Sequence, residues 1–187
     1  MSRALIVLAL LACLGATACG QPSGPAATGA SSSPSILAQP PPAVRLRAAG
    51  DAILSDQAVG SARRGGHDHL TAEQAASEQP DQGAAMTEYA GWGWLDGASR
   101  TWTTADETLV ITARPDEAAR ALDFWAKDAA QSRCPPAAMA GLDDCRLGVS
   151  GDRAVVVGRL ASAVFRLQCP ASAAERLAAD QAAALHP

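Results

Sequence analysis

The pattern of hydrophobic and polar positions divides the chain into three parts. Residues 4–18 form an unbroken run of 15 apolar or small residues. Residues 20–43 consist mostly of Pro, Ser, Gly and Ala without a periodic apolar pattern, which is typical of a disordered tether. From residue 44 onward, apolar positions recur with helix or strand spacing between turn residues. We therefore expect one folded domain over residues 44–187.

Helix signals occur at four places in this domain. The pattern Ser/Thr-x-x-Glu/Gln, whose side chains can cap the start of a helix, begins at Thr71 and again at Ser172. Asp81 can cap another short helix. Apolar residues at helical spacing predict a longer helix over about 115–132.

Strand signals lie between and after these helices. Alternating apolar residues and turn residues predict a hairpin and then three short strands: 99–104, 107–113, 146–149, 153–157 and 163–168. The most economical architecture is an α+β fold, an antiparallel sheet with helices packed on one face. The order hairpin and then helix occurs twice, which is compatible with a weak internal duplication.

The N-terminal segment indicates where the protein works. Arg3 precedes the apolar run, which is shorter than the ~18 residues that indicate a membrane span, and small residues follow. Residues 1–18 are therefore interpreted as a secretory signal peptide. Cys19 comes directly after it and is the candidate for lipidation, which would leave residues 19–43 as a lipidated Cys and its tether. Lipidation at Cys13 and release as an ordinary secreted protein are the alternatives.

Three further cysteines belong to the domain: Cys134, Cys145 and Cys169. Outside the cytoplasm a disulfide is expected. Cys134 and Cys145 are the preferred pair, because they would close a short loop that contains Pro135-Pro136. A bond from Cys169 to either of them, or no disulfide at all, stays open.

Several features together resemble a group of uncharacterised actinobacterial lipoproteins. They are the lipobox-like Ala-Thr-Ala-Cys, the segment LTAEQA, Gly-Trp before a Gly-x-x-Arg, an Ala-rich amphipathic helix, and the closing segment AERLAADQAAAL. The resemblance covers roughly residues 67–187 and the lipobox. It implies a small α+β domain at the cell membrane, on its extracytoplasmic face, and no particular activity.

Charge and composition narrow the classes of partner. The formal net charge is −4, which argues against nucleic acid as a partner. We expect contact with the membrane through the lipid anchor, and an envelope protein or a small ligand as the partner of the domain. No cofactor is expected.

Few residues carry candidate chemistry. Trp92, Trp94 and Trp102 lie close in sequence and are candidates for a ligand surface. His67 and His69 are weak candidates for a metal site, since no second cluster of ligands accompanies them. The sequence contains no catalytic motif that we can assign. It favours a non-catalytic binding or sensory module; the alternative is a cell-envelope enzyme with an unrecognised site.

Overall fold

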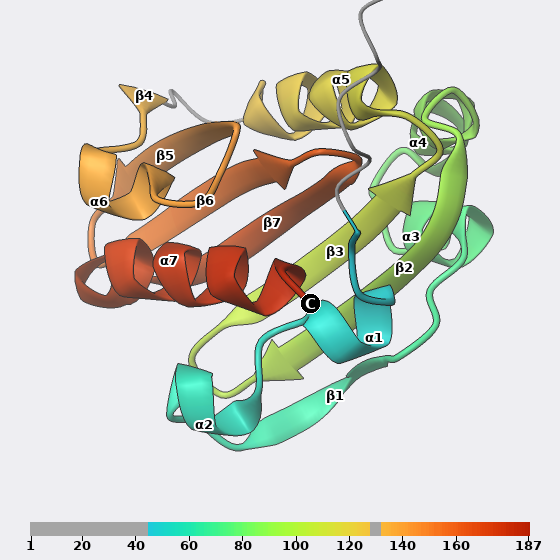
Figure 1. Ribbon diagram of the computed structural model, residues 1–187. Helices are drawn as coiled ribbons and strands as arrows, with labels where there is room; N and C mark the ends of the chain where they lie inside the picture. The colour runs from blue at the N-terminus through green and yellow to red at the C-terminus, as the bar shows by residue number, and fades with distance from the viewer. Residues whose placement is uncertain (1–44, 128–131) are drawn as a thin grey trace, which may run out of the picture. The chain divides into compact units, whose positions relative to one another are not determined.

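An antiparallel sheet forms the centre of the domain (Figure 1). The computed structural model describes residues 45–127 and 132–187, and within these ranges seven strands pair in the order β1-β2-β3-β7-β6-β5-β4. The strands are β1 (Arg63–His67), β2 (Trp94–Trp102), β3 (Asp106–Thr112), β4 (Ser132–Arg133), β5 (Asp144–Ser150), β6 (Arg153–Leu160) and β7 (Ala163–Pro170). Every pair is antiparallel. This confirms the α+β class.

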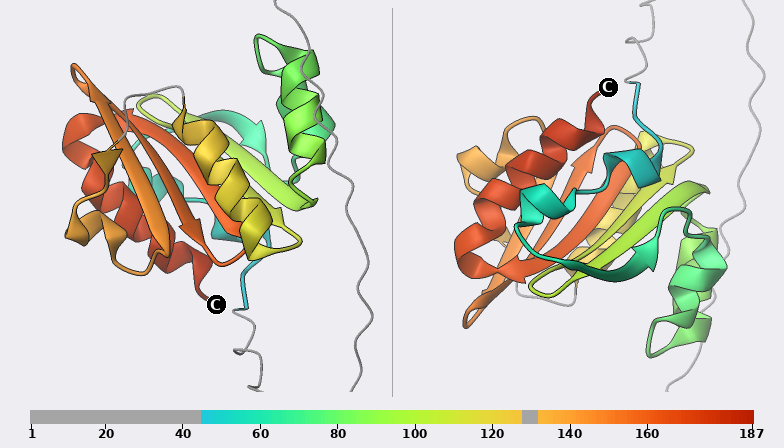
Figure 2. Two further views of the ribbon diagram at one scale, coloured as in Figure 1. Left: turned by 90° about the horizontal axis from the view of Figure 1, so that it is seen from above. Right: turned by 90° about the horizontal axis from the view of Figure 1, so that it is seen from below.

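Helices cover both faces of the sheet, so the expectation of a single covered face was wrong (Figure 2). One face carries α3 (Ala72–Ser77), α4 (Gln82–Ala90) and α5 (Pro115–Ala126). The other carries α1 (Ala49–Ala52), α2 (Asp56–Val59), α6 (Pro136–Met139) and α7 (Ala174–Leu185). We call the two apolar layers the α5-side core and the α7-side core.

The central strands explain this two-sided packing. Successive side chains of a strand point to opposite faces. On β3, Leu109 packs in the α7-side core and Val110 in the α5-side core. On β7, Phe165 and Val164 divide in the same way. Because consecutive residues are apolar, both faces of these strands must be covered.

Side chains close to the backbone fix most of the helix starts. Thr71 and Gln74 form the expected capping box of α3, and the Asp81 carboxylate accepts from the backbone N–H of Ala84 at the start of α4. The box expected at Ser172 does not form. A short 3₁₀ turn, Ala171–Ala173, precedes α7 instead, and Ala173 occupies the N-cap.

The hairpin-then-helix order is present twice, as β2-β3-α5 and as β6-β7-α7. The two helices pack on opposite faces of the sheet, however. A two-fold axis that exchanged the two antiparallel hairpins within one sheet would keep both helices on one face. The repeated order is therefore not accompanied by a symmetric arrangement.

A disulfide joins Cys134 and Cys145, with a Cα–Cα distance of 5.4 Å, as preferred from the sequence. It links the segment before α6 to β5. Cys169 is a buried free thiol on β7. Among the described residues, no helix is both long and apolar enough to cross a bilayer. The expected signal peptide and tether, with Cys13 and Cys19, lie outside the described residues.

Candidate functional site

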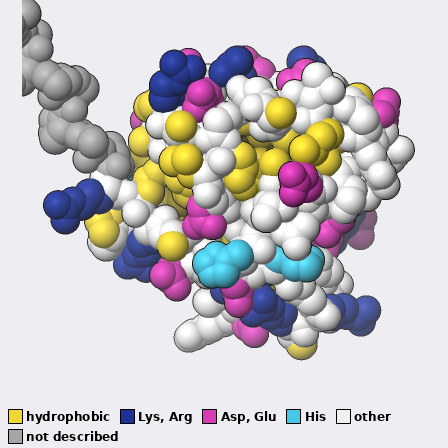
Figure 3. All heavy atoms as spheres, turned by 90° about the vertical axis from the view of Figure 1, so that its right-hand side faces the viewer, with side chains coloured by type: hydrophobic (Ala, Val, Ile, Leu, Met, Phe, Trp, Pro, Cys, Tyr) yellow, Lys and Arg dark blue, Asp and Glu magenta, His cyan; other side chains and the backbone are white. Residues whose placement is uncertain are grey.

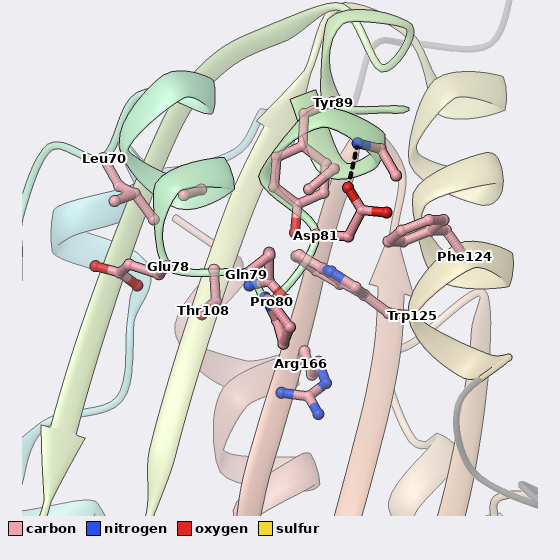
Figure 4. Close-up of a pocket in the computed structure, with 13 residues that line it drawn as sticks. Leu70, Glu78, Gln79, Pro80, Asp81, Tyr89, Thr108, Phe124, Trp125 and Arg166 are labelled. Carbon is pink, nitrogen blue, oxygen red and sulfur yellow. Dashed lines mark hydrogen bonds between the residues drawn. The ribbon is translucent and has the colours of Figure 1, made fainter. Parts of the chain in front are cut away.

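A cavity of about 280 Å³ opens on the α5-side face of the sheet. It lies between α5, strands β3 and β7, and the α3–α4 pair with the connection between these two helices (Figure 4). Its walls therefore come from segments that are far apart in the sequence. The cavity has three parts: a polar floor on the sheet, an aromatic wall, and an acidic rim.

The floor consists of two side chains on neighbouring strands. Thr108 of β3 and Arg166 of β7 are direct partners in the antiparallel register, and both line the cavity. The Gln168 amide lies against Arg166; with its oxygen facing the guanidinium, it accepts from Nη1 and Nη2 at 2.7 and 2.6 Å. The sheet thus presents, side by side, a hydroxyl and a positively charged guanidinium with several N–H donors.

Tyr89 of α4 and Phe124 and Trp125 of α5 form the aromatic wall. The centroids of the Tyr89 and Phe124 rings are 6.2 Å apart. Behind them, Trp92 packs edge-on against Trp125, with a centroid distance of 5.4 Å. The wall is therefore the front of a larger aromatic cluster, whose packing holds the rings in place.

The rim is formed by the connection from α3 to α4. Glu78 and Asp81 line it together with Gln79 and Pro80. One Asp81 oxygen accepts from the α4 backbone at 3.0 Å. Glu78 lies near His67, with 3.9 Å between Oε1 and Nε2. The rim therefore contributes carboxylates opposite the guanidinium of the floor.

The Tyr89 hydroxyl interacts with charges from two sides of the cavity. Burial and the nearby Glu78 raise the pKa of Tyr89, while a hydrogen bond with Trp125 and the positive charge of Arg166 oppose this shift. The net pKa is above the ordinary value of 10.0. The phenol therefore stays protonated near neutral pH and serves as a neutral hydrogen-bonding group.

The three tryptophans expected to form one ligand surface do not do so. Trp92 and Trp102 are only 1 % and 2 % exposed, and they belong to opposite cores. The Trp102 indole donates to the Asp56 carboxylate at 2.7 Å on the α7 side. Trp94 is partly buried and lines a shallow, more open hollow with His69 and the exposed Leu95. Figure 3 shows hydrophobic side chains at the surface on this side of the molecule, with histidines below them.

The two histidines have separate partners. His67 is near Glu78, and His69 has Nδ1 at 3.7 Å from an oxygen of Asp96. Asp68 between them is turned to Arg63 and Arg100. Within residues 45–127 and 132–187, no group of three or more His, Cys, Asp or Glu is arranged to hold a metal ion.

A separate polar cluster is buried on the α7 side. Glu107 is 2 % exposed, and burial raises its pKa to about 8 despite a hydrogen bond from the Leu54 N–H and the nearby charge of Arg100. Arg100 donates to the backbone oxygens of Gly50, Ile53 and Leu54. This cluster fastens the first segment of the domain to the sheet and lies outside the cavity.

Sequence reasoning missed the residues of the cavity because their positions in the sequence are widely separated. One signal was available: Arg166 interrupts an apolar strand between Phe165 and Leu167. A charged side chain on a strand covered on both faces must meet a polar group or an opening. The chain matches no known protein family, no curated protein and no solved structure. The geometry of the cavity is therefore the basis for assigning a function.

Proposed function

We propose that the protein is a lipid-anchored, extracytoplasmic binding module that takes up a small ligand in the cavity between α5 and the α3–α4 pair. The anchor at Cys19 and the tether over residues 19–43 are read from the sequence. The resemblance to actinobacterial lipoproteins supports the same compartment. The domain would then present its cavity outside the membrane.

The observation that carries the proposal is the lining of the cavity. Small-molecule sites are concave, mostly apolar or aromatic, and contain a few converging polar groups. Here the partly buried Phe124, with the buried Trp125 beside it, supplies the aromatic surface, and Thr108 and Arg166 supply the polar groups. The volume of about 280 Å³ is near the lower end of the range for such sites. It suits a small ligand.

The pKa shifts of Tyr89 and Glu107 favour binding without catalysis over an envelope enzyme. In the cavity, the raised pKa makes Tyr89 a poor base near neutral pH. The carboxyl with the strongly raised pKa, Glu107, is enclosed on the opposite face. The cavity thus offers hydrogen bonds and ring surfaces, which hold a ligand in place.

NMR of the tryptophan indoles tests the proposal directly. The chain has four tryptophans, and ¹⁵N-tryptophan labelling of the full chain in lipid nanodiscs would give one indole signal for each. Substitution of each Trp by Phe would assign them. Pools of small sugars, amino acids, carboxylates and amines are then added in turn.

We expect at least one pool to shift the Trp125 signal, because this ring lines the cavity. Trp102, buried on the opposite face, is the internal control and should not shift. If no pool moves the Trp125 signal, or if Trp102 responds equally, the cavity is not a ligand site.

A further inference from the structure

We propose that the ligand of this cavity is a single neutral sugar ring, an inference that rests on the binding function proposed above. A sugar ring has apolar C–H faces and a rim of hydroxyls, each of which can both donate and accept a hydrogen bond. The cavity offers partners for both surfaces. The argument proceeds from its size, its charges and the placement of its polar groups.

The size of the cavity suits one ring. The cavity measures about 280 Å³, which corresponds to roughly nine water molecules at ~30 Å³ each. Its walls are closed on one side by the sheet and on another by α5 (Figure 4). An oligosaccharide would have to extend beyond these walls, whereas one ring with its hydroxyls fits between them.

The charges of the lining disfavour ligands of a single sign. Arg166 lies on the floor, while Glu78 and Asp81 lie on the rim. An anion would approach the two exposed carboxylates of the rim, and a cation would approach the guanidinium of the floor. A neutral polyhydroxyl ligand avoids both penalties, because its hydroxyls can donate to carboxylates and accept from a guanidinium.

The polar groups are placed to bind neighbouring hydroxyls. Thr108 and Arg166 are register partners on adjacent strands. Directly opposed side chains of an antiparallel pair have Cβ atoms about 5 Å apart. The Thr108 hydroxyl and the longer Arg166 side chain therefore start from neighbouring points of the floor, where each can bind a hydroxyl of the same ring. The Tyr89 side chain, only 2 % exposed, lines the cavity from α4 and closes it on that side.

The aromatic wall provides the complementary apolar surface. Trp125 and Phe124 come from one turn of α5, and both line the cavity beside the polar floor. Ring faces carry partial negative charge and attract the slightly positive C–H groups of a sugar face. The cavity thus combines an apolar wall with a polar floor. A sugar ring needs both, because its C–H faces are apolar and its hydroxyls are polar.

Calorimetric titration of the full chain in nanodiscs tests the class of ligand. The probes are glucose, galactose and N-acetylglucosamine as neutral sugars, glycine betaine as a zwitterion, and phenylacetate as an anion. Each is also followed by the Trp125 indole signal. We expect at least one neutral sugar to bind and to shift that signal, and betaine and phenylacetate to bind more weakly by roughly tenfold or more.

Two conservative substitutions test whether the sugar binds to the floor of the cavity. Thr108→Val removes only the hydroxyl, and Arg166→Lys keeps the charge but loses the planar fork. Each should weaken sugar binding by roughly tenfold. The matched controls are Thr101→Val on the exposed surface of β2 and Arg120→Lys on the exposed surface of α5, which should change affinity less than about twofold. Circular dichroism and the melting temperature verify that all four variants fold.

The outcomes separate this inference from the binding function itself. If betaine or phenylacetate shifts the Trp125 signal and the sugars do not, the ligand class is wrong and the binding function stands. If a sugar binds equally to the Thr108 and Arg166 variants and to their controls, the sugar site lies elsewhere and the inference is overturned. If none of these five probes moves the Trp125 signal, the sugar inference is overturned, and the wider pools described above decide the binding function.

Discussion

Glu107 illustrates how strongly one buried side chain can make the stability of this fold depend on pH. It projects from β3 toward the first segment of the domain, and its carboxyl accepts one hydrogen bond from the Leu54 backbone at 3.1 Å. Its second oxygen, Oε1, has no partner among the described residues. Burial without full compensation favours the neutral acid, which explains a pKa of about 8 against an ordinary 4.5.

We predict that the stability of the domain falls as the pH rises from 4.5 to 8. The folded state retains the Glu107 proton over this window, whereas the unfolded chain has released it. The contribution is complete below pH 4.5 and is lost as the pH passes 8. Glu107→Gln stays neutral throughout, so its free energy of unfolding relative to the wild type should rise by roughly 2–4 kcal/mol across this range.

Urea unfolding at pH 4.5, 6 and 8 measures this difference. Glu73→Gln, at an exposed position on α3, is the matched control and should follow the wild-type curve. Parallel pH curves for the wild type and the Glu107 variant would show that this carboxyl is ionised in the folded protein.

The two β2 tryptophans should differ in their contribution to stability. Trp102→Ala should cost about 3–5 kcal/mol, because a fully buried ring and its hydrogen bond to Asp56 are lost. Trp94→Ala also removes a hydrogen bond, from the indole to the Leu70 carbonyl, but its ring is partly exposed, so the loss should be roughly half as large. Denaturant unfolding compares them, and equal losses would contradict the different burial of the two rings.

At the scale of elements, the disulfide constrains the segment that carries α6. Cys134 and Cys145 are 11 residues apart, and closing a loop of this length in the unfolded chain is worth about 3 kcal/mol. We predict a loss of this size for the double Cys→Ser variant in chemical denaturation. Reductant should destabilise the wild type similarly and leave the double variant unchanged. If reductant does not change the stability of the wild type, the disulfide does not contribute the predicted free energy.

The longer elements could be predicted because their side chains carry the signal themselves. The alternation around Leu109 predicted β3 to within one residue at each end. The helical spacing around Leu122 predicted α5 and its start at Pro115, but the predicted end at residue 132 lies six residues beyond the observed end at Ala126. β1 was not predicted as a strand, because Arg63–His67 contains Arg and Gly, and its conformation depends on pairing with β2. The start of α7 was misplaced because a 3₁₀ turn replaces the expected cap.

The coverage of both faces of the sheet also has a signal in the sequence. Residues 154–157 read Ala-Val-Val-Val, a continuous apolar run rather than an alternation. Such runs indicate a strand buried on both faces. Ala154 and Val156 indeed pack in the α7-side core, while Val157 packs in the α5-side core.

At the scale of the whole molecule, the sequence contains one local signal for the cavity, Arg166 within an apolar strand, but does not show which residues surround it. Thr108 and Arg166 become neighbours only through the pairing of β3 with β7, and Tyr89 reaches them only because α4 packs on the same face as α5. None of these residues forms a local motif. The proposed compartment, by contrast, is inferred from a local pattern at the N-terminus, and this inference requires no knowledge of the fold.

The proposed lipid anchor gives a prediction for the intact cell. Cys19→Ala should move the protein from the membrane fraction to the medium or the soluble fraction, because the acyl chains that hold it are lost. Cys13→Ala is the matched control and should leave the protein in the membrane fraction. Fractionation followed by immunoblotting measures both. The opposite behaviour of the two variants would assign the anchor to Cys13.

Filling the cavity from its rim tests the binding site most directly. Ala84 lines the cavity from α4, and Ala90 lies exposed on the same helix outside it. With the probe that binds best to the wild type, titration of the Trp125 indole signal should show binding reduced by more than about tenfold in Ala84→Phe and unchanged in Ala90→Phe. Equal affinity in the two variants would mean that the ligand does not occupy this cavity.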